Sequence, residues 1–240
     1  MATRRKRTTW IRGVLWLLGA ALLLPALQTG CVRFVNPPAT TLMFLRDAEA
    51  RCTQKHVGPR AYQWVDLAKM DRDFLHLALV SEDQRFFQHD GFDWEEIEIA
   101  RKRAARKNTP VRGASTISMQ CARSLFLWPG RSWIRKGAEA YYTLWLELLV
   151  PKERILELYA NVAEFGPHIY GVGAAARTYY RADAHSLTRA QAAMLVSLLP
   201  APTAWNPHAP SPKLKRRYAR LLRTPSSQPI PGWNERTARP

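Results

Sequence analysis

The hydrophobic residues of this chain recur mostly at helical spacing. The clearest case is residues 132–149, where successive apolar positions are separated by four, three, four and three residues. That spacing places them on one face of an α-helix, which completes a turn every 3.6 residues. The positions of this stripe are Ile134, Ala138, Tyr141, Trp145 and Leu148. The pattern predicts a long amphipathic helix.

Four other segments show helical periodicity or helix-end signals. They are residues 71–87, 117–127, 152–162 and 187–199. Pro151 suits the first turn of a helix, Thr188 is a typical N-cap residue, and Pro200 stops the last segment. We find no run of alternating strands and no internal repeat, so the predicted fold class is mainly α.

A nearly unbroken apolar run at residues 14–27 follows the basic residues at positions 4–7. With Trp10 and Ile11 added, the run is about as long as a bilayer is thick, and Arg12 is close enough to its end to reach the interface. Basic residues before a span predict a cytoplasmic N-terminus and an exported remainder. We therefore predict a cytoplasmic segment at residues 1–12 and a transmembrane anchor at residues 13–30.

Two other interpretations of this N-terminal region stay open. Pro25 and the short apolar core would also suit a cleaved signal peptide. A lipoprotein is a weaker alternative, because Cys31 follows Gly30 but Gln28 occupies a position where a small aliphatic residue is expected. Cys31 and Cys52 could form a disulfide in an oxidising compartment, and the sequence does not decide this.

The remaining chain divides by composition. The Asn-Pro-Pro sequence at residues 36–38 marks a linker, which we place at residues 31–59. Residues 60–210 form one predicted catalytic domain, since 240 residues fit one domain plus short tails. Residues 211–240 are rich in Pro, Ser and Arg, and predict a loosely ordered basic tail.

The net charge of +17 is concentrated in three patches. Residues 1–12, 101–107 and 213–240 carry +5, +5 and +7, so the rest of the chain is neutral. Such patches suit a polyanionic partner such as anionic lipid, diphosphate or nucleic acid, although solvated charge runs are the simpler interpretation of each one alone. Nucleic acid conflicts with the predicted export, and no recognition motif for it is present.

Glu82 is the first candidate for chemistry. It lies four residues after Ala78 and three after Leu79, on or beside the apolar stripe of its predicted helix. A carboxylate there is costly unless it is paired or hydrogen-bonded, and such a group can serve as a proton acceptor. The simpler interpretation is an ion pair with Arg85, three residues further along the helix.

The segment GASTISMQ at residues 113–120 is the second candidate. A glycine and several hydroxyl groups at a predicted helix start can form an anion site or a simple N-cap. Cations follow it, and beside a helix-start anion site they would suit a diphosphate leaving group. These cations are Arg123, Arg131, Arg135 and Lys136. Arg135 and Glu139 are also i,i+4 neighbours, for which an ordinary surface ion pair is the simpler interpretation.

Five segments in this order resemble the signature motifs of the peptidoglycan glycosyltransferases, the transglycosylases of bacterial wall synthesis. They are EDQRFFQHDGF (82–92), GASTISMQCARSLF (113–126), RKGAE (135–139), RILELYAN (154–161) and GAAARTYY (173–180). The resemblance covers about residues 67–207. The single predicted span and the lack of a following domain resemble the monofunctional biosynthetic type, whose fold is a helical, two-lobed, lysozyme-like domain.

The resemblance implies roles for individual residues. Glu82 would be the general base that takes a proton from the GlcNAc 4-hydroxyl of the acceptor lipid II. That oxygen would attack C1 of the donor's MurNAc and expel undecaprenyl diphosphate. Glu139 would be the second essential carboxylate, on the diphosphate side. The implied substrate-binding residues are Asp83, Arg85, Ser115, Thr116, Gln120, Arg123, Arg131, Arg135 and Lys136. Glu157, Asn161 and residues 173–180 would shape the cleft.

The sequence departs from the family pattern at four positions. Arg123 stands where lysine is usual, which keeps the charge and changes the geometry. Met119 replaces the first of two glutamines, Ala114 replaces a glycine, and Gln191 stands where glutamate is common. Because both carboxylates and Gln120 are present, we expect activity to survive and the donor affinity and rate to differ.

The predicted function is polymerisation of lipid II by an enzyme of the bacterial inner membrane, with its catalytic domain in the periplasm. The implied partners are lipid II, undecaprenyl-linked glycan, anionic membrane lipids and, as an open option, proteins of cell division or elongation. No metal site is predicted and no cofactor is firmly required, with Mg²⁺ or Mn²⁺ at the diphosphate left open. The alternatives are a lysozyme-like hydrolase, which would need no cationic cradle, and a tethered wall-binding protein without catalysis.

Overall fold

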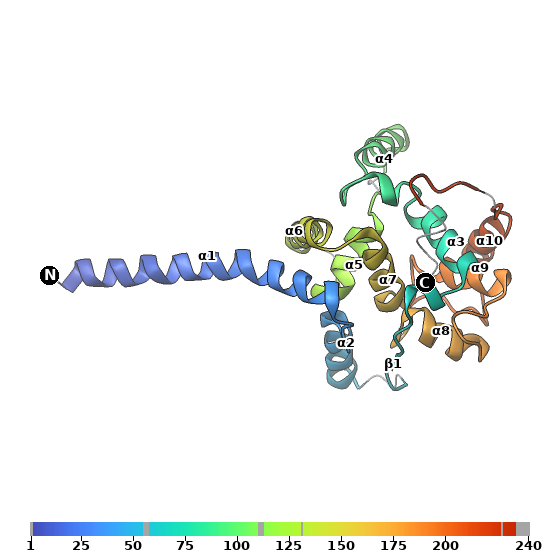
Figure 1. The fold of residues 1–240 in the computed structure, drawn as a ribbon, viewed down its shortest axis with the longest axis horizontal. Coiled ribbons are helices and arrows are strands. Elements are labelled where there is room, and N and C mark those ends of the chain that lie inside the picture. The colour runs from blue at the N-terminus through green and yellow to red at the C-terminus, as the bar shows by residue number, and fades with distance from the viewer. Residues whose placement is uncertain (1, 55–57, 110–112, 131, 227, 234–240) are drawn as a thin grey trace.

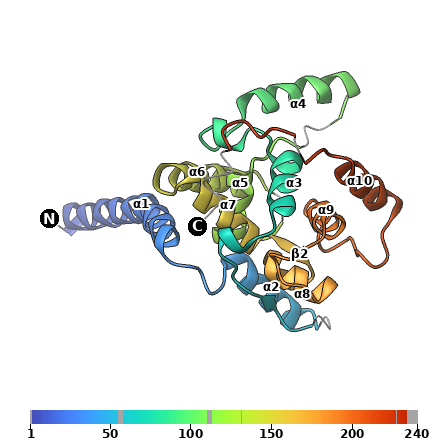
Figure 2. The same ribbon diagram turned by 45° about the vertical axis from the view of Figure 1, so that its right-hand side comes forward.

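A computed structural model of residues 1–240 describes the chain except at residues 1, 55–57, 110–112, 131, 227 and 234–240. The side chains of residues 2–11, 14, 15, 17 and 18 also lie outside the described part. One long helix projects from a helical body (Figure 1), and a turned view shows the other helices gathered around α5 and α7 (Figure 2).

Helices make up most of the described chain, as the periodicity predicted. In chain order they are α1 (Ala2–Phe34), α2 (Thr41–Cys52), η1 (Leu67–Lys69), α3 (Arg72–Glu82), η2 (Phe86–Gln88), α4 (Trp94–Lys107), α5 (Ile117–Phe126), α6 (Trp133–Leu149), α7 (Lys152–Val162), α8 (Gly171–Tyr180), α9 (Arg189–Leu198) and α10 (Pro212–Leu222). The two η elements are short 3₁₀ helices.

A small sheet was not predicted. It consists of β1 (Ala61–Tyr62), β2 (Glu164–Gly166) and β3 (Ile169–Tyr170), in the order β1-β3-β2. β3 pairs parallel with β1 and antiparallel with β2. Strands of two or three residues are too short to show an alternating pattern in the sequence, which is why periodicity missed them.

The helices predicted from periodicity are confirmed to within a few residues, except that the segment predicted at 71–87 ends at Glu82. Side-chain caps fix several of the starts. Thr188 accepts a hydrogen bond from the backbone N–H of Gln191, and the Gln191 side chain accepts one from the N–H of Thr188, which completes a capping box. Ser132 caps α6 in the same way, by accepting from the N–H of Arg135.

The core forms around α5 and α7, which pack against each other. Ile117, Cys121 and Leu125 are buried at four-residue spacing on α5, so one face of this short helix lies wholly in the core. α6 packs on α5, while α3 packs on α9, which in turn contacts α10. The first residues of α5 and the last residue of α3 therefore lie on the same well-packed body.

Two residues of the fourth motif hold the chain that leads into α3. Asn161 accepts a hydrogen bond from the N–H of Val65 at 2.8 Å and donates one to the Val65 carbonyl at 2.8 Å. Glu157 accepts from the N–H of Leu67 at 2.9 Å. Asn161 is fully buried, and its backbone lies against Gly171, where a Cβ atom would come within 2.4 Å of the Asn161 carbonyl oxygen. These side chains serve the fold.

The faces of α6 are the reverse of what an amphipathic helix on a soluble body shows. Its buried residues are Arg135, Glu139, Thr143 and Leu146. In the apolar stripe predicted from the spacing, Ile134 is 80% exposed and Leu148 72% exposed. Periodicity correctly predicted the helix, but it does not say which face meets the core, and here the polar face does.

The segments predicted as a linker and as a loosely ordered tail both contain helices. Residues 31–59, predicted as a linker, include α2, which Thr40 caps. Residues 211–240, predicted as a loosely ordered tail, include α10, which Ser211 caps and whose Leu214 and Leu221 are buried. Composition alone suggested a loose tail. The signals for α10 are its cap, the proline at its start and two leucines at seven-residue spacing.

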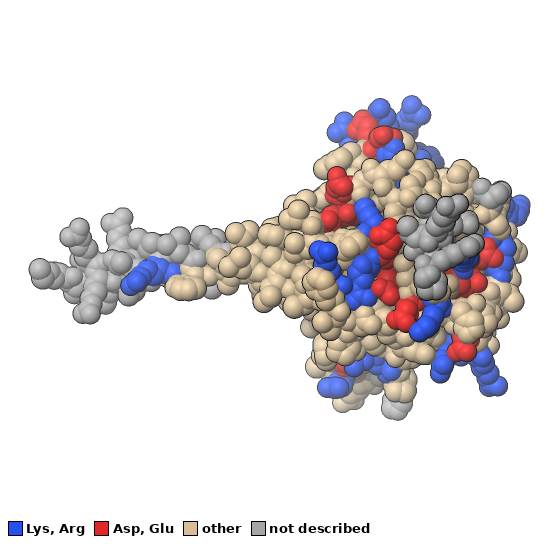
Figure 3. Space-filling view, viewed as in Figure 1, with Lys and Arg blue, Asp and Glu red and all other residues tan. Residues whose placement is uncertain are grey.

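Within the part of the chain that the structure describes, no helix has both the length and the apolar character needed to cross a membrane. The anchor predicted at residues 13–30 is not found there, and several of its side chains lie outside the described residues. Between Arg12 and Arg33 the sequence of α1 contains no Lys, Arg, Asp or Glu, and the described part of this projecting stretch is tan in Figure 3. Cys31 and Cys52 are both free and exposed, without a disulfide between them.

Candidate active site

Glu82 is the last residue of α3, and its side chain is only 12% exposed. Three side chains hold its carboxylate. Ser81 donates a hydrogen bond to Oε1 at 3.0 Å, Gln120 donates to Oε2 at 3.3 Å, and the Arg217 guanidinium forms an ion pair with Oε1. A carboxylate at the negative end of a helix and largely out of water needs such partners. The sequence suggested Arg85 as the partner, and the structure shows Arg217 instead.

A line of polar side chains leads from Glu82 to the cations of the third motif. Gln120 lies between Glu82 and the Ser115 carbonyl, to which its amide donates at 3.5 Å. Lys136 donates to the Ser115 hydroxyl at 3.2 Å and forms an ion pair with Glu139. Four residues assigned from the resemblance are thus brought into one continuous network with the candidate base.

Arg135 and Glu139 form a buried ion pair. The distance from Nη1 to Oε2 is 2.7 Å, Glu139 is fully buried and the Arg135 side chain is 9% exposed. The i,i+4 spacing was recognised in the sequence, but an exposed pair was the simpler interpretation. Both oxygens of Glu139 accept from cations, so this carboxylate holds the cationic side chains of α6 in place.

The start of α5 does bind an anion, and that anion belongs to the chain. Asp83, buried and directly after Glu82, accepts from the N–H of Ile117 at 2.9 Å and from His89 at 3.0 Å. Thr116 caps the helix and donates its hydroxyl proton to the Gly91 carbonyl. The first and second motifs are therefore joined at this helix start. The hydrogen bonds of Asp83 and Thr116 are made within the protein, where they hold the two motifs together.

Arg85 is committed to neighbouring carboxylates. It donates to Asp93 from two guanidinium nitrogens and also pairs with Glu95. The hydrogen bond from Arg85 holds the pKa of Asp93 below its usual range. Asp93 in turn caps α4 by accepting from the N–H of Glu96 at 2.9 Å. Arg85 thus fixes the start of α4 beside the site.

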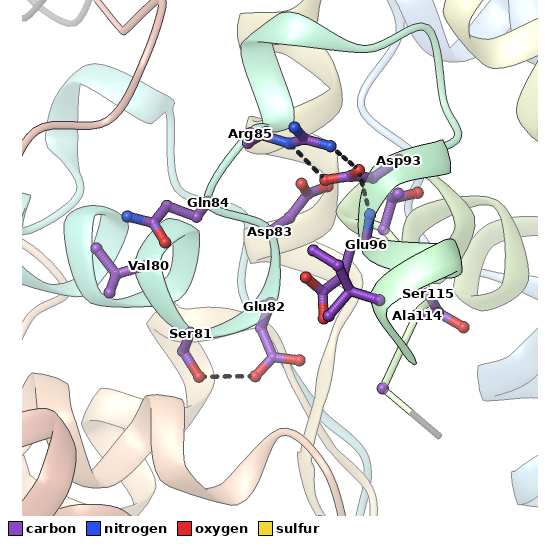
Figure 4. A pocket seen from close by; sticks show the side chains of 13 residues that line it. Val80, Ser81, Glu82, Asp83, Gln84, Arg85, Asp93, Glu96, Ala114 and Ser115 are labelled. Carbon is purple, nitrogen blue, oxygen red and sulfur yellow. Dashed lines mark hydrogen bonds and ion pairs between the residues drawn. The ribbon is translucent and has the colours of Figure 1, made fainter. Parts of the chain in front are cut away.

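A cavity of about 350 Å³ opens beside Glu82, and we call it the Glu82 cavity. It is enclosed by the end of α3, the turn after it, the start of α4 and the segment before α5 (Figure 4). Its lining residues include Glu82, Asp83, Arg85, Asp93, Glu96, Ile99, Ser115 and Thr116. The lining is mostly polar and includes four carboxylates, and Figure 4 shows Glu82 at the end of α3 and Ser115 on the segment before α5.

A second cavity of about 460 Å³ lies beyond Gln120, and we call it the arginine cavity because three arginines line it. The arginines are Arg46, Arg123 and Arg135, from α2, α5 and α6. Gln120 lines this cavity and donates a hydrogen bond to Glu82, which lines the other one, so this bond links the linings of the two cavities. Two concave polar spaces joined in this way suit a reaction between two substrate molecules.

Several buried polar atoms around the arginine cavity have no hydrogen-bond partner within the described residues. They are Arg46 Nε, Arg135 Nε, Tyr159 Oη and Glu164 Oε1. Burial raises the pKa of Glu164 above its ordinary value and that of Tyr159 far above it. Buried donors and acceptors without partners are costly, so a ligand rich in hydroxyl groups and phosphate oxygens would satisfy them.

Four residues at the site were missed by sequence reasoning. Arg217 contacts Glu82, and Arg46, Tyr159 and Glu164 line the arginine cavity. Arg46 and Arg217 lie in segments judged to be a linker and a tail, where only the caps of α2 and α10 could have shown helices. Arg131, which the resemblance placed at the diphosphate, lies outside the described residues.

Glu139, the carboxylate that the resemblance places at the diphosphate, already has two cationic partners. Both oxygens of Glu139 already accept from Arg135 and Lys136. In the described ranges no three His, Cys, Asp or Glu side chains come together as metal ligands. The fit is therefore poor for a divalent cation held by Glu139, which the resemblance had left open.

Comparison with known proteins gives a consistent result. The family model described as Transglycosylase matches residues 50–225. The chain is 44% identical over 225 residues to a protein of Xanthomonas campestris pv. campestris (strain B100) named biosynthetic peptidoglycan transglycosylase, which covers 92% of this chain and 91% of that protein. A protein of Xylella fastidiosa (strain 9a5c) with the same name is 42% identical over 218 residues, covering 91% and 89%. The match to the family model includes all of α10 and the last residues of α2.

Proposed function

Because this chain belongs to the transglycosylase family, and is a peptidoglycan glycosyltransferase that polymerises lipid II into glycan strands, we propose that Glu82 is the general base of the transfer. The observation that carries this proposal is the network in which Gln120, Ser115 and Lys136 join the Glu82 carboxylate to Glu139. A proton acceptor and a cationic cradle are thus held in one rigid unit, between two cavities.

The acceptor lipid II places its GlcNAc 4-hydroxyl in the Glu82 cavity. Glu82 takes the hydroxyl proton as the oxygen forms a bond to C1 of the donor's MurNAc, and the bond from C1 to the diphosphate oxygen breaks with inversion at C1. A positioned base accelerates such a step by about 10²–10⁴-fold. Ser115 lines the same cavity as Glu82 and holds the sugar through its hydroxyl group.

The donor's diphosphate lies in the arginine cavity. Arg123 and Arg135 line this cavity, and Lys136 extends the cationic surface toward Ser115. Cations fixed in advance stabilise the charge that develops on the leaving diphosphate without having to reorganise. Glu139 keeps Arg135 and Lys136 in place through its two oxygens. No step of this scheme passes through a metal ion.

The enzyme acts on the bacterial cell wall, and its substrate carries a lipid. We assign it to the inner membrane, with the body of the protein in the periplasm and the N-terminal part of α1 as a single anchor. The exposed leucines of α1 support this assignment, as Leu22, Leu23, Leu24 and Leu27 are each more than half exposed on the described surface.

The role of Glu82 is tested with the detergent-solubilised full chain and lipid II, with polymer detected on a gel. Glu82→Gln keeps the shape of the side chain and removes the base, so polymerisation should fall about 10²–10⁴-fold while the helical circular dichroism spectrum is retained. Glu153→Gln on α7, which lines neither cavity, is the matched control and should keep its activity. More than a tenth of the activity remaining in Glu82→Gln would contradict the proposal.

A further inference from the structure

Arg217 on α10 contacts the candidate base Glu82, which lies 135 residues earlier in the sequence. Arg217 Nη2 donates to both Glu82 Oε1 and Ser81 Oγ. The contact is sheltered, since the side chains of Arg217 and Glu82 are 16% and 12% exposed. An ion pair held away from water at a site of catalysis is stronger and better oriented than a surface pair.

The chain holds α10 in this position by several independent contacts. Ser211 caps the helix, Pro212 begins it, and Leu214 and Leu221 are buried in the core beside α9. The position of α10 therefore does not depend on the ion pair itself, and the packing of its apolar face holds Arg217 over the end of α3.

The residues after α10 return to α3, the helix that ends in Glu82. His76 Nε2 lies 2.8 Å from the Gln228 carbonyl, and the His76 ring stacks on Trp233. Ile230 is buried, and Gly232 lies so close to Phe87 that a Cβ atom there would come within 2.8 Å of the Phe87 side chain. The described part of the chain at residues 228–233 is thus packed against the helix that carries the base and the turn after it.

Three other cations near the base are engaged elsewhere. Arg135 and Lys136 pair with Glu139, and Arg85 pairs with Asp93 and Glu95. Within the described residues, the ion pair formed by Glu82 is the one with Arg217. Arg217 and Gln120 hold different oxygens of the carboxylate, so together they restrain its position and its plane.

We propose that Arg217 is a positioning residue for the reaction, which orients the Glu82 carboxylate toward the Glu82 cavity. This inference rests on the proposed role of Glu82 as the base. Arg217 lines neither cavity and acts on the reaction through Glu82. Because a misplacement of about 1 Å at a reacting group can lower a rate about 10²-fold, loss of Arg217 lowers kcat and leaves lipid II binding nearly unchanged. Lysine keeps the charge but cannot reproduce the planar guanidinium, so it restores the rate in part.

The experiment compares Arg217→Gln and Arg217→Lys with Arg216→Gln in the full chain. Arg216 is the neighbouring arginine on α10, is exposed, and contacts neither cavity, so it is a matched control. For Arg217→Gln we expect kcat to fall about 10–100-fold, with KM for lipid II within about threefold of the parent value. Arg217→Lys should recover part of the loss, and Arg216→Gln should differ less than about twofold in either constant.

Three results would overturn the inference. Arg217→Gln could keep the kcat of Arg216→Gln, or it could raise KM with kcat unchanged, which would make Arg217 a substrate-binding residue. Alternatively, Arg217→Lys could have the melting temperature of the parent protein but a kcat no higher than that of Arg217→Gln. Lysine would then fail to recover any of the lost rate, contrary to the expectation. If Arg217→Gln is unfolded at the assay temperature, Arg217→Lys decides alone: a folded variant with the parent kcat and KM overturns the inference, and a fall in kcat alone supports it.

A double variant separates this inference from the proposed function. If Arg217 acts through Glu82, adding Arg217→Gln to Glu82→Gln lowers the residual polymerisation rate no further, whereas independent roles give multiplied losses. If Glu82→Gln is itself active, Glu82 is not the base. This test of the base assignment does not depend on any Arg217 variant. If Glu82→Gln is inactive and Arg217→Gln is as active as the parent, the positioning role fails and the base assignment stands.

Discussion

At the scale of single residues, the motifs contain two kinds of side chain that the sequence does not distinguish. Glu82, Ser115 and Lys136 lie in one network beside the cavities, where substrate would contact them. Asp83 and Thr116 belong to the same motifs and also line the Glu82 cavity, but they are buried and bond to backbone groups. The second kind holds the first in place. Asp83 directly follows Glu82 in the sequence and bonds to the start of α5, so it fixes Glu82 relative to that helix.

The buried pair of Arg135 and Glu139 leads to a prediction at this scale. Glu139→Gln leaves the Arg135 guanidinium buried without its counter-charge, which costs about 3–5 kcal/mol of unfolding free energy. The loss is measured by urea denaturation of the solubilised protein, followed by circular dichroism. Polymerisation should fall as well, because Arg135 and Lys136 lose the carboxylate that positions them.

An exposed pair of the same spacing serves as the control. Glu98 and Lys102 are i,i+4 neighbours on α4, with side chains 44% and 66% exposed. Glu98→Gln should change the unfolding free energy by less than about 1 kcal/mol. If Glu139→Gln and Glu98→Gln lower the unfolding free energy equally, the Glu139 carboxylate stabilises the protein no more than a surface charge does.

At the scale of elements, α4 carries the basic patch that the sequence places at residues 101–107. Residues 101–107 form its C-terminal half, and the five cations among them are exposed. Arg101 and Lys102 each lie 3.5 Å from Glu98, which offsets part of their charge. Trp94 and Ile99 are exposed on the same helix, and Ile99 also lines the Glu82 cavity. Figure 3 shows basic and acidic side chains mixed over this end of the molecule.

We predict that α4 holds the Glu82 cavity against an anionic membrane surface. Replacing its five cations with Gln removes about 1 kcal/mol of attraction for each charge near the surface, screened by salt. In proteoliposomes, the ratio of lipid II turnover in anionic membranes to that in neutral membranes should fall toward one. Turnover of a short-chain analogue in detergent should change little.

The control for α4 replaces an equal number of cations on and just after α10. These are Lys213, Lys215, Arg216, Arg220 and Arg223. If that variant loses as much of the anionic preference as the α4 variant, total charge explains the effect and α4 has no special contact. If the α4 variant keeps the full preference, its charge is simply solvated.

At the scale of the whole molecule, α1 and α6 form one apolar region to the side of the body. α6 packs along α1, and Tyr142 donates to Gln28 at 2.6 Å. Trp133, at the start of α6, is 92% exposed, and Leu144 further along is 55% exposed. A continuous exposed apolar surface on a protein marks a contact with another molecule or with lipid. It lies on the same end of the body as the projecting helix in Figure 1.

We predict that α1 is an uncleaved anchor and that this apolar region faces the bilayer. Protein purified from membranes should resist alkaline extraction, and its intact mass should include every residue from the N-terminus through α1. A mature N-terminus near Gly30, or a lipid on Cys31, would instead show one of the two processing alternatives. A deletion of residues 2–21 serves as the control, and it should shift the protein into the soluble fraction.

The sequence by itself determined most of the helices and, through the motifs, Ser115, Gln120, Lys136 and Glu139 of the network around Glu82. Periodicity, N-caps and motifs depend on residues within a few turns of each other, so they can be found without a fold. What the tertiary structure decided depends on contacts between distant segments. Which face of α6 is buried, which anion sits at the start of α5, and which cation pairs with Glu82 all follow from packing. Arg217 was missed for this reason: it lies within a basic segment, and only the burial of Leu214 and Leu221 brings it to the base.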